Sequence, residues 1–212
     1  MDYLLAGISC GGQYALIAIG YTMVYGILRL INFAHSDVFM VGGLLVVYMQ
    51  TSLPYYVAIP LAVLLTVLLA FGIEKCAYKP LRSAPRMSVM ISAIGVSYLI
   101  QNVALYVTGG QPQTYPSLSF LSRQVSIFGS STNMVTVITP VIVAALVVGL
   151  VILVNKTKIG TAMRASSVDF STAQLMGIKI NSVISFTFII GALLPAVGSV
   201  LYFNNYPSVI PT

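Results

Sequence analysis

The chain has 212 residues, of which 58% are hydrophobic and only 7% are charged. Soluble domains carry about 25% charged residues, so this composition excludes a soluble globular protein and indicates a polytopic membrane protein. The net charge of +6 would favour nucleic acid as the partner of a soluble protein. Here the Lys and Arg residues fall between apolar segments, where they set the orientation of a membrane protein. We therefore expect a lipid bilayer, and no nucleic acid, among the partners.

The first apolar segment, residues 3–28, contains five glycines and no charged side chain. Small residues on a membrane-spanning helix usually mark close contact with another helix, so we expect an interior helix here. No basic region precedes the segment, which argues against a cleaved secretory signal.

The next segment, residues 29–50, is interrupted near its start. At about 1.5 Å per residue, residues 36–50 reach only about 22 Å, short of the roughly 30 Å hydrocarbon core. The segment is therefore either a half-helix that begins within the membrane or a full span whose first turn is residues 30–34. Asn32, Ser36 and Asp37 are residue types that favour a helix start, so we expect a break at residues 32–35. A half-helix would turn its free N–H groups toward a central pathway.

His35 and Asp37 are the only ionisable side chains well inside an apolar segment. Such groups are functional candidates, and Asp37 could contact a substrate. We favour a local role, in which Asp37 caps the first turn of the half-helix and His35 donates to a neighbouring carbonyl. We expect no metal site, because positions two apart do not share a helix face and the chain has no second His.

Four further apolar segments follow, at residues 57–73, 87–107, 133–154 and 181–202. Together these patterns predict an all-α membrane protein, a polytopic helical bundle of about six transmembrane segments. The loops at 74–86 and 155–180 carry four Lys or Arg residues each, whereas the polar loop at 108–132 carries only Arg123. By the positive-inside rule the two basic loops are cytoplasmic. Arg29 favours an external N-terminus, although a re-entrant half-helix would reverse that orientation.

The loop at 155–180 has a helical pattern bounded by two helix breakers, Gly160 and Gly177. Small residues recur between them, so a short helix there could lie close against another protein's surface. We expect this loop to dock onto a cytoplasmic partner. The alternative is a basic loop that only binds anionic lipid headgroups, a role that we favour for Lys156 and Lys158.

Catalytic machinery is not indicated. The chain has one His and four acidic residues, and Asp2, Glu74 and Asp169 fall at or outside the expected membrane edges. Metalloprotease, phosphate-loop and nucleophile motifs are all missing from the sequence. We expect neither an enzyme nor a cofactor, but a pathway-forming subunit driven by a partner. An ATP-independent channel or facilitator for a small solute stays open as the alternative.

Several blocks of the sequence resemble the permeases of branched-chain amino acid ABC importers, the high-affinity Leu/Ile/Val type that is grouped with urea and amide permeases. The resemblance spans essentially the whole chain. Its blocks are YALIAIGYTMVYGIL followed by INFAHSD at 14–37, EKCAYKPLRS at 74–83, ISAIG at 91–95, GTAMRASSVDFSTAQLMGI at 160–178 and TFIIGA at 187–192.

The resemblance implies import of branched-chain amino acids, or of a related small polar solute, across the bacterial inner membrane. It implies a second permease subunit, two ATPase subunits and a periplasmic substrate-binding protein as partners. It makes residues 1–212 a single permease domain, expected to lack its C-terminal part because family members continue with further spans. Ser36 stands where the family commonly has Gly. The resemblance assigns the ATPase-docking role within 155–180 to Gly160, Arg164, Ala165, Asp169, Ala173 and Gly177.

Overall fold

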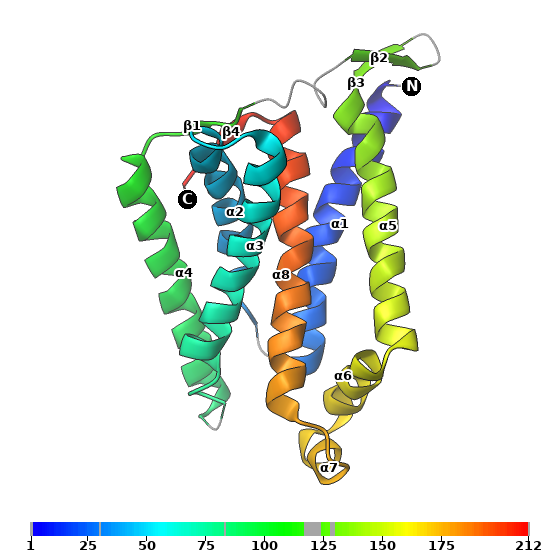
Figure 1. The fold of residues 1–212 in the computed structure, drawn as a ribbon. Coiled ribbons are helices and arrows are strands. Elements are labelled where there is room, and N and C mark those ends of the chain that lie inside the picture. Colours follow the sequence, from blue (N-terminus) through cyan, green and yellow to red (C-terminus); the bar gives the residue numbers. More distant parts are fainter. Residues whose placement is uncertain (1, 30, 83, 117–123, 128–129, 212) are drawn as a thin grey trace.

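The computed structural model describes residues 2–29, 31–82, 84–116, 124–127 and 130–211. It is a bundle of helices with two short strand pairs, which confirms the predicted all-α class (Figure 1). The helices are α1 (Asp2–Leu28), α2 (His35–Gln50), α3 (Tyr55–Ile73), the π-helical turn η1 (Glu74–Tyr78), α4 (Arg86–Thr108), α5 (Met134–Lys156), α6 (Lys158–Val168), α7 (Phe170–Leu175) and α8 (Ile180–Asn205).

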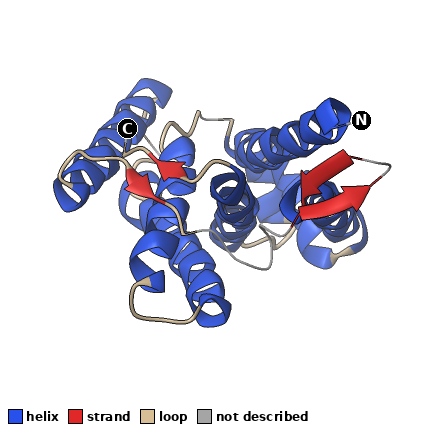
Figure 2. Ribbon diagram, turned by 90° about the horizontal axis from the view of Figure 1, so that it is seen from above, coloured by secondary structure: helices blue, strands red, loops and turns tan. Residues whose placement is uncertain are grey.

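The strands are short and lie together at one end of the bundle (Figures 1 and 2). The first, β1 (Gln113–Thr114), pairs antiparallel with β4 (Ser208–Val209). The second pair is β2 (Gln124–Ile127) with β3 (Ser130–Asn133), also antiparallel. We call this end of the bundle the strand end. Arg123 of the predicted polar loop lies outside the described residues.

Among the described residues, five helices are long and apolar enough to cross a membrane: Tyr3–Leu28, Tyr55–Tyr78, Met87–Thr108, Met134–Lys156 and Ile180–Asn205. Within lipid a helix satisfies its backbone hydrogen bonds internally, which is why these apolar runs are helical throughout. The sixth predicted segment contains α2, which has 16 residues and is therefore about 24 Å long.

The interior helix of this chain is α8 rather than α1. About 72% of the α8 span is buried, against 22% of the α1 span, because α8 packs against α1, α2 and α3 together. For three of the α1 glycines, Gly7, Gly11 and Gly26, no neighbouring atom of the described residues lies within 4 Å of where a Cβ would stand. The expectation that α1 is interior is therefore wrong within this chain, since its small residues only partly face another helix.

Glycines set the close approach of α8 to its neighbours. A Cβ on Gly20 of α1 would stand 2.6 Å from the carbonyl oxygen of Gly191. A Cβ on Gly42 would meet the Ser199 hydroxyl at 2.6 Å, and one on Gly43 would overlap the ring of Phe203. Small residues at such crossings let helix backbones approach closely.

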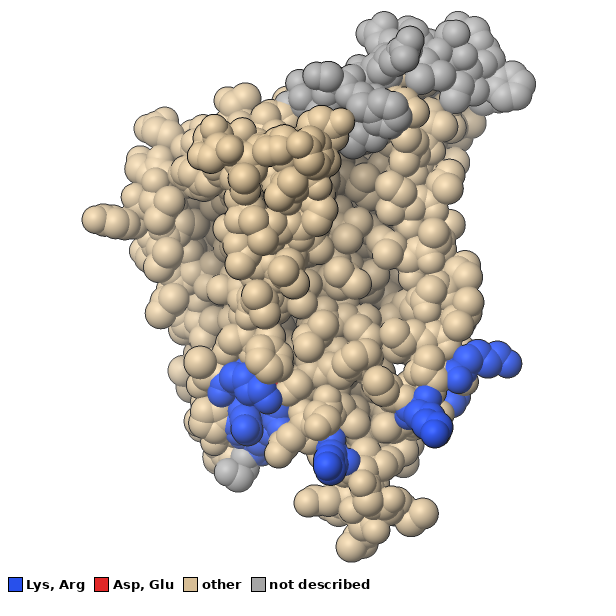
Figure 3. All heavy atoms as spheres, in the orientation of Figure 1, with Lys and Arg blue, Asp and Glu red and all other residues tan. Residues whose placement is uncertain are grey.

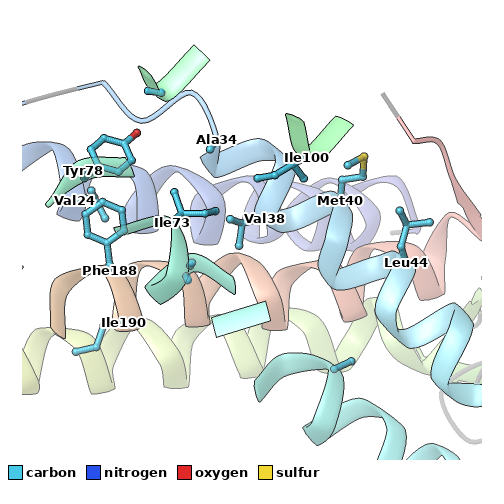
Figure 4. Packing of buried hydrophobic residues seen from close by; sticks show 14 of the residues in the cluster. Val24, Ala34, Val38, Met40, Leu44, Ile73, Tyr78, Ile100, Phe188 and Ile190 are labelled. Atoms are coloured by element: carbon cyan, nitrogen blue, oxygen red, sulfur yellow. The ribbon is translucent and has the colours of Figure 1, made fainter. Parts of the chain in front are cut away.

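The main hydrophobic cluster lies between α1, α2, α3 and α8. Figure 4 shows part of it, with Val24 of α1, Ile73 of α3 and Phe188 of α8 close together. These three side chains border a void of only about 10 Å³, too small to hold more than one water molecule. The cluster is thus close-packed around the start of α2.

The Lys and Arg residues visible in Figure 3 gather at the end opposite the strands. This end carries η1 and the two short helices α6 and α7, so the loops 74–86 and 155–180 lie on the same side of the bundle (Figure 1). We call it the basic end. The arrangement matches the predicted charge asymmetry between the two groups of loops.

Candidate pathway and docking site

The break between α1 and α2 lies where the sequence predicts it. Helix α1 ends at Leu28, Arg29 adopts a left-handed conformation with φ of 52°, and α2 begins only at His35. Residues 31–34 are not helical. Of the two predicted alternatives, the structure therefore shows the shortened helix rather than a span beginning at residues 30–34.

Asn32 and His35 are fixed by groups from other elements. The Tyr78 hydroxyl of η1 donates to Asn32 Oδ1 at 2.8 Å, and both residues are buried. His35 Nε2 lies 3.2 Å from the Ile17 carbonyl oxygen, and the His35 ring meets Tyr21 edge-on at 5.8 Å. His35 therefore does contact a backbone carbonyl as expected, whereas Asn32 anchors the break to η1 instead of capping α2.

Asp37 lies in the first turn of α2 as predicted, but it does not cap the helix, which corrects that part of the prediction. The N-cap position is Ala34, and among the described residues no side chain accepts a capping hydrogen bond there. Asp37 is only 3% exposed, and its Oδ1 accepts a hydrogen bond from Gln101 Nε2 of α4 at 2.9 Å. Its Oδ2 is buried without a hydrogen-bond partner among the described residues. The carboxylate faces α4 because Gln101 offers a donor within the apolar bundle, which the sequence spacing does not reveal.

A mainly apolar groove of about 540 Å³ runs between α1 and the break. Its polar groups come from Tyr14, Tyr21 and Thr22 on one side and from Asn32, His35 and Ser36 on the other. The Ser36 hydroxyl donates to the Phe33 carbonyl at 3.4 Å. Three of the four predicted pathway residues thus line one groove, and Asp37 lies outside it.

Glu74 is the most buried acidic residue among the described side chains, and it lies in η1 near the end of the Tyr55–Tyr78 span. Its side chain is fully shielded and forms an ion pair with Arg82. The Ser185 hydroxyl of α8 donates to Glu74 Oε2 at 3.0 Å, and Lys75 Nζ lies 3.6 Å from the same oxygen. Arg82 also donates to Asn181. In the sequence, this cluster is indicated only by the basic residues that follow Glu74 in the EKCAYKPLR run.

The predicted docking loop contains two helices instead of one. α6 ends at Val168, and Asp169 is the N-cap of α7. The Asp169 carboxylate accepts from the backbone N–H groups of Ser171 and Thr172, at 3.0 and 3.3 Å, and from the Thr172 hydroxyl. These hydrogen bonds lower the pKa of Asp169, and the bond from the Thr172 hydroxyl has the largest effect. The carboxylate is therefore engaged with α7, not paired with Arg164.

The six predicted docking residues divide into two groups. Gly160 and Ala173 are buried, and a Cβ on Gly160 would overlap the carbonyls at the end of α5. Gly177 ends α7 with a φ of 82°, a backbone conformation that favours glycine. Arg164, Ala165, Asp169 and Gly177 are exposed.

The predicted set omits three exposed apolar side chains at the basic end. They are Val168, Leu175 and Met176, which are 78%, 88% and 79% exposed. We call these three residues the apolar tip. The sequence shows Leu175 and Met176 as apolar residues beside a helix end. It does not show that their side chains are exposed, because this depends on the turn at Asp169.

Arg29 connects the break to α6, the first helix of the predicted docking loop. Its guanidinium Nη2 donates to the Ser167 carbonyl at 2.9 Å and to the Val168 carbonyl at 3.4 Å. These carbonyls belong to the last turn of α6, where a positive charge is favourable. A cavity of about 320 Å³, lined by Arg29, Arg82 and Asp169 among others, lies beside this contact.

Comparison with known proteins shows similarity along the whole chain. The family described as branched-chain amino acid transport system / permease component matches residues 3–212. The chain is 36% identical over 224 residues to the high-affinity branched-chain amino acid transport system permease protein BraD of Pseudomonas aeruginosa, covering 100% of this chain and 73% of BraD. It is 35% identical over 225 residues to LivH of Escherichia coli, with the same two shares.

A more distant similarity is to the probable branched-chain amino acid transport permease protein LivH of Methanocaldococcus jannaschii. The identity is 29% over 199 residues, which cover 89% of this chain and 62% of that protein. No solved structure matches the chain.

Proposed function

Because the chain belongs to the family of branched-chain amino acid transport permeases, we propose that it forms part of the membrane pathway of an ATP-driven importer of branched-chain amino acids. The observation that carries this proposal is the match of the family along residues 3–212. The chain is a multi-pass membrane protein, and in a bacterium it would lie in the inner membrane.

The proposed partners are a second permease subunit, two ATPase subunits and a periplasmic substrate-binding protein. The basic end faces the cytoplasm in this arrangement, because Lys and Arg favour that side of the membrane. The strand end faces outward and would receive the solute from the binding protein.

The apolar tip supports an ATPase-docking role for α6 and α7. Val168, Leu175 and Met176 are largely exposed at the end of the bundle that carries the basic residues, beyond the spanning helices. Exposed apolar side chains of this size are costly in water and favour a protein contact. Gly160, Ala173 and Asp169 then shape the two helices, whereas Arg164 and Ala165 lie on the exposed side.

The groove at the break supports a role in solute passage. It brings Asn32, His35 and Ser36 to an opening of about 540 Å³ on the surface of a spanning helix, where a second permease subunit could complete its wall. Ligand sites in transporters commonly lie at interrupted helices near the membrane midplane.

The test is uptake of radiolabelled leucine by vesicles that contain the complete assembly with the binding protein. We expect uptake with ATP inside the vesicles and none with a non-hydrolysable analogue. Uptake that continues without ATP would support the ATP-independent facilitator and overturn the importer.

Docking is tested separately by co-purification with the ATPase subunits. Leu175→Asp should reduce the recovered ATPase, because it places a charge on the apolar tip. Val151→Asp is not a suitable control, since it would disturb membrane insertion of α5. Thr161→Asp is a better one, because Thr161 is exposed on α6 and outside the apolar tip.

A further inference from the structure

A polar cavity lies at the strand end, between α1, α5 and α8. Its volume is about 140 Å³. Ser9, Cys10 and Gln13 line it from α1, Thr136 from α5 and Asn205 from α8. It is separate from the groove at the break, which has a different set of lining residues.

Gln13 is the most unusual residue of this cavity. It is 1% exposed, yet neither its amide nitrogen nor its carbonyl oxygen has a hydrogen-bond partner among the described residues. Ser9 is 2% exposed, and its hydroxyl oxygen also has none. Burying an amide or a hydroxyl without a hydrogen bond costs several kcal/mol in an apolar medium, so buried polar groups almost always have partners.

The cavity is large enough to contain the missing partner. A water molecule occupies about 30 Å³ of liquid volume, and cavities with several polar groups are hydrated whereas apolar ones stay dry. The volume of about 140 Å³ therefore accommodates several waters or one small solute. An adjacent amide and hydroxyl offer both donors and acceptors to such a molecule.

The residues that line the cavity disfavour a charged ligand. Among the described residues that line the cavity, none is Lys, Arg, His, Asp or Glu. An ion or a zwitterion would thus lose its hydration without gaining a counter-charge. We propose that Gln13 and Ser9 form a binding site for a small uncharged molecule that both donates and accepts hydrogen bonds, either water or a neutral solute.

Cys10 provides a probe inside the site. In the full chain with Cys76→Ser, the rate at which methyl methanethiosulfonate modifies Cys10 reports how readily water and the reagent enter the cavity, since Cys10 is one of its lining residues. We expect Gln13→Leu to slow this reaction by about tenfold, because the cavity loses its main polar group. Gln13→Asn should keep most of the wild-type rate. Asn102→Leu, an exposed change on α4, is the control and should have no effect.

Two added solutes then distinguish the possible ligands. If acetamide protects Cys10 and glycine does not, the site binds a neutral solute. If neither protects while Gln13→Leu still slows the reaction, the site holds water. An equal rate in wild type and Gln13→Leu, both folded, would overturn the proposal. Protection by zwitterionic glycine at least as strong as by acetamide would overturn it as well.

Discussion

Glu74 and Arg82 form an ion pair in which the Glu74 side chain is completely shielded from solvent and the Arg82 side chain is 19% exposed. The pair joins the end of α3 to the loop before α4, and Ser185 and Asn181 extend it to the first turns of α8. Three elements at the basic end are therefore held by one buried charge.

Glu74→Leu should destabilise the protein strongly, because Arg82 and Lys75 would keep their charges without a counter-charge. Breaking a buried pair costs about 3–5 kcal/mol, and we expect the lower part of this range since Arg82 retains some contact with solvent. Thermal unfolding in detergent is the measurement. Lys79→Leu, at an exposed position of the same loop, is the control. Equal melting temperatures for both variants would contradict the role of the pair.

The contact between Gln101 and Asp37 predicts a different pattern from that of a helix cap. Gln101→Leu should lower stability by about 1–3 kcal/mol, because it leaves the buried Asp37 carboxylate without its donor. Asp37→Asn should be milder, since an amide oxygen still accepts from Gln101. Asn102→Leu, on the exposed side of α4, should change little. If Gln101→Leu left both thermal stability and uptake unchanged, Asp37 would have to be satisfied by another group.

Gly43 should not tolerate a larger residue. A Cβ at this position overlaps the ring of Phe203, which is packed among Phe39, Tyr115 and Tyr202 and cannot easily move. We expect Gly43→Ala to cost about 1–3 kcal/mol by overpacking. Gly95→Ala, in open space on α4, should be neutral or stabilising. Adding Phe203→Leu to Gly43→Ala should restore part of the lost stability, because it removes the overlapping ring. If the double variant is no more stable than Gly43→Ala alone, the overlap with Phe203 is not the cause of the loss.

The Asp169 cap predicts that the stability of the first turn of α7 depends on pH. The folded-state pKa of Asp169 is below its ordinary value of 3.8, chiefly through the Thr172 hydroxyl. The cap thus contributes stability above pH 3.8, and this contribution is lost as the pH falls through the lower folded pKa. Hydrogen exchange of the Ser171 and Thr172 amides should accelerate in that acidic range, relative to the intrinsic rate. In Asp169→Asn the protection should not depend on pH, and an identical pH profile in both proteins would refute the cap.

Replacing Arg29 should affect the coupling of ATP hydrolysis to uptake more than it affects folding. Arg29→Gln removes the charge that holds the last turn of α6, so α6 and α7, the proposed docking helices, would lose their contact with the break. We expect the assembly to retain ATP hydrolysis while leucine uptake falls severalfold. Lys156→Gln, at an exposed position, is the control for loss of a positive charge at the same end. A parallel fall of hydrolysis and uptake in Arg29→Gln would indicate failed assembly instead.

Spans and charge asymmetry were predictable from the sequence because they depend on local composition. The run at 133–154 and α5 at Met134–Lys156 differ only at their ends, for example. The break before His35 was predictable for the same reason, since too few apolar residues follow it to cross a membrane.

What the sequence could not reveal were contacts between distant segments. Asp37 and Gln101 are 64 positions apart, and Glu74 and Ser185 are 111 apart. Whether a carboxylate caps its own helix or accepts from another one depends on tertiary packing. The division of the docking loop at Asp169 was missed because its helical pattern continues on both sides of the turn.

The crossing of Gly20 and Gly191 holds α8 against α1 near mid-length, because Gly191 lies near the middle of this 26-residue helix. The helix is about 39 Å long and has one end next to α7 and the other next to β4. Closer to the strand end, Ser199 and Phe203 of the same helix lie against Gly42 and Gly43 of α2. A displacement of α7 at the basic end would therefore be carried along α8 to α2 and to the strand end, because these contacts prevent α8 from moving independently of its neighbours.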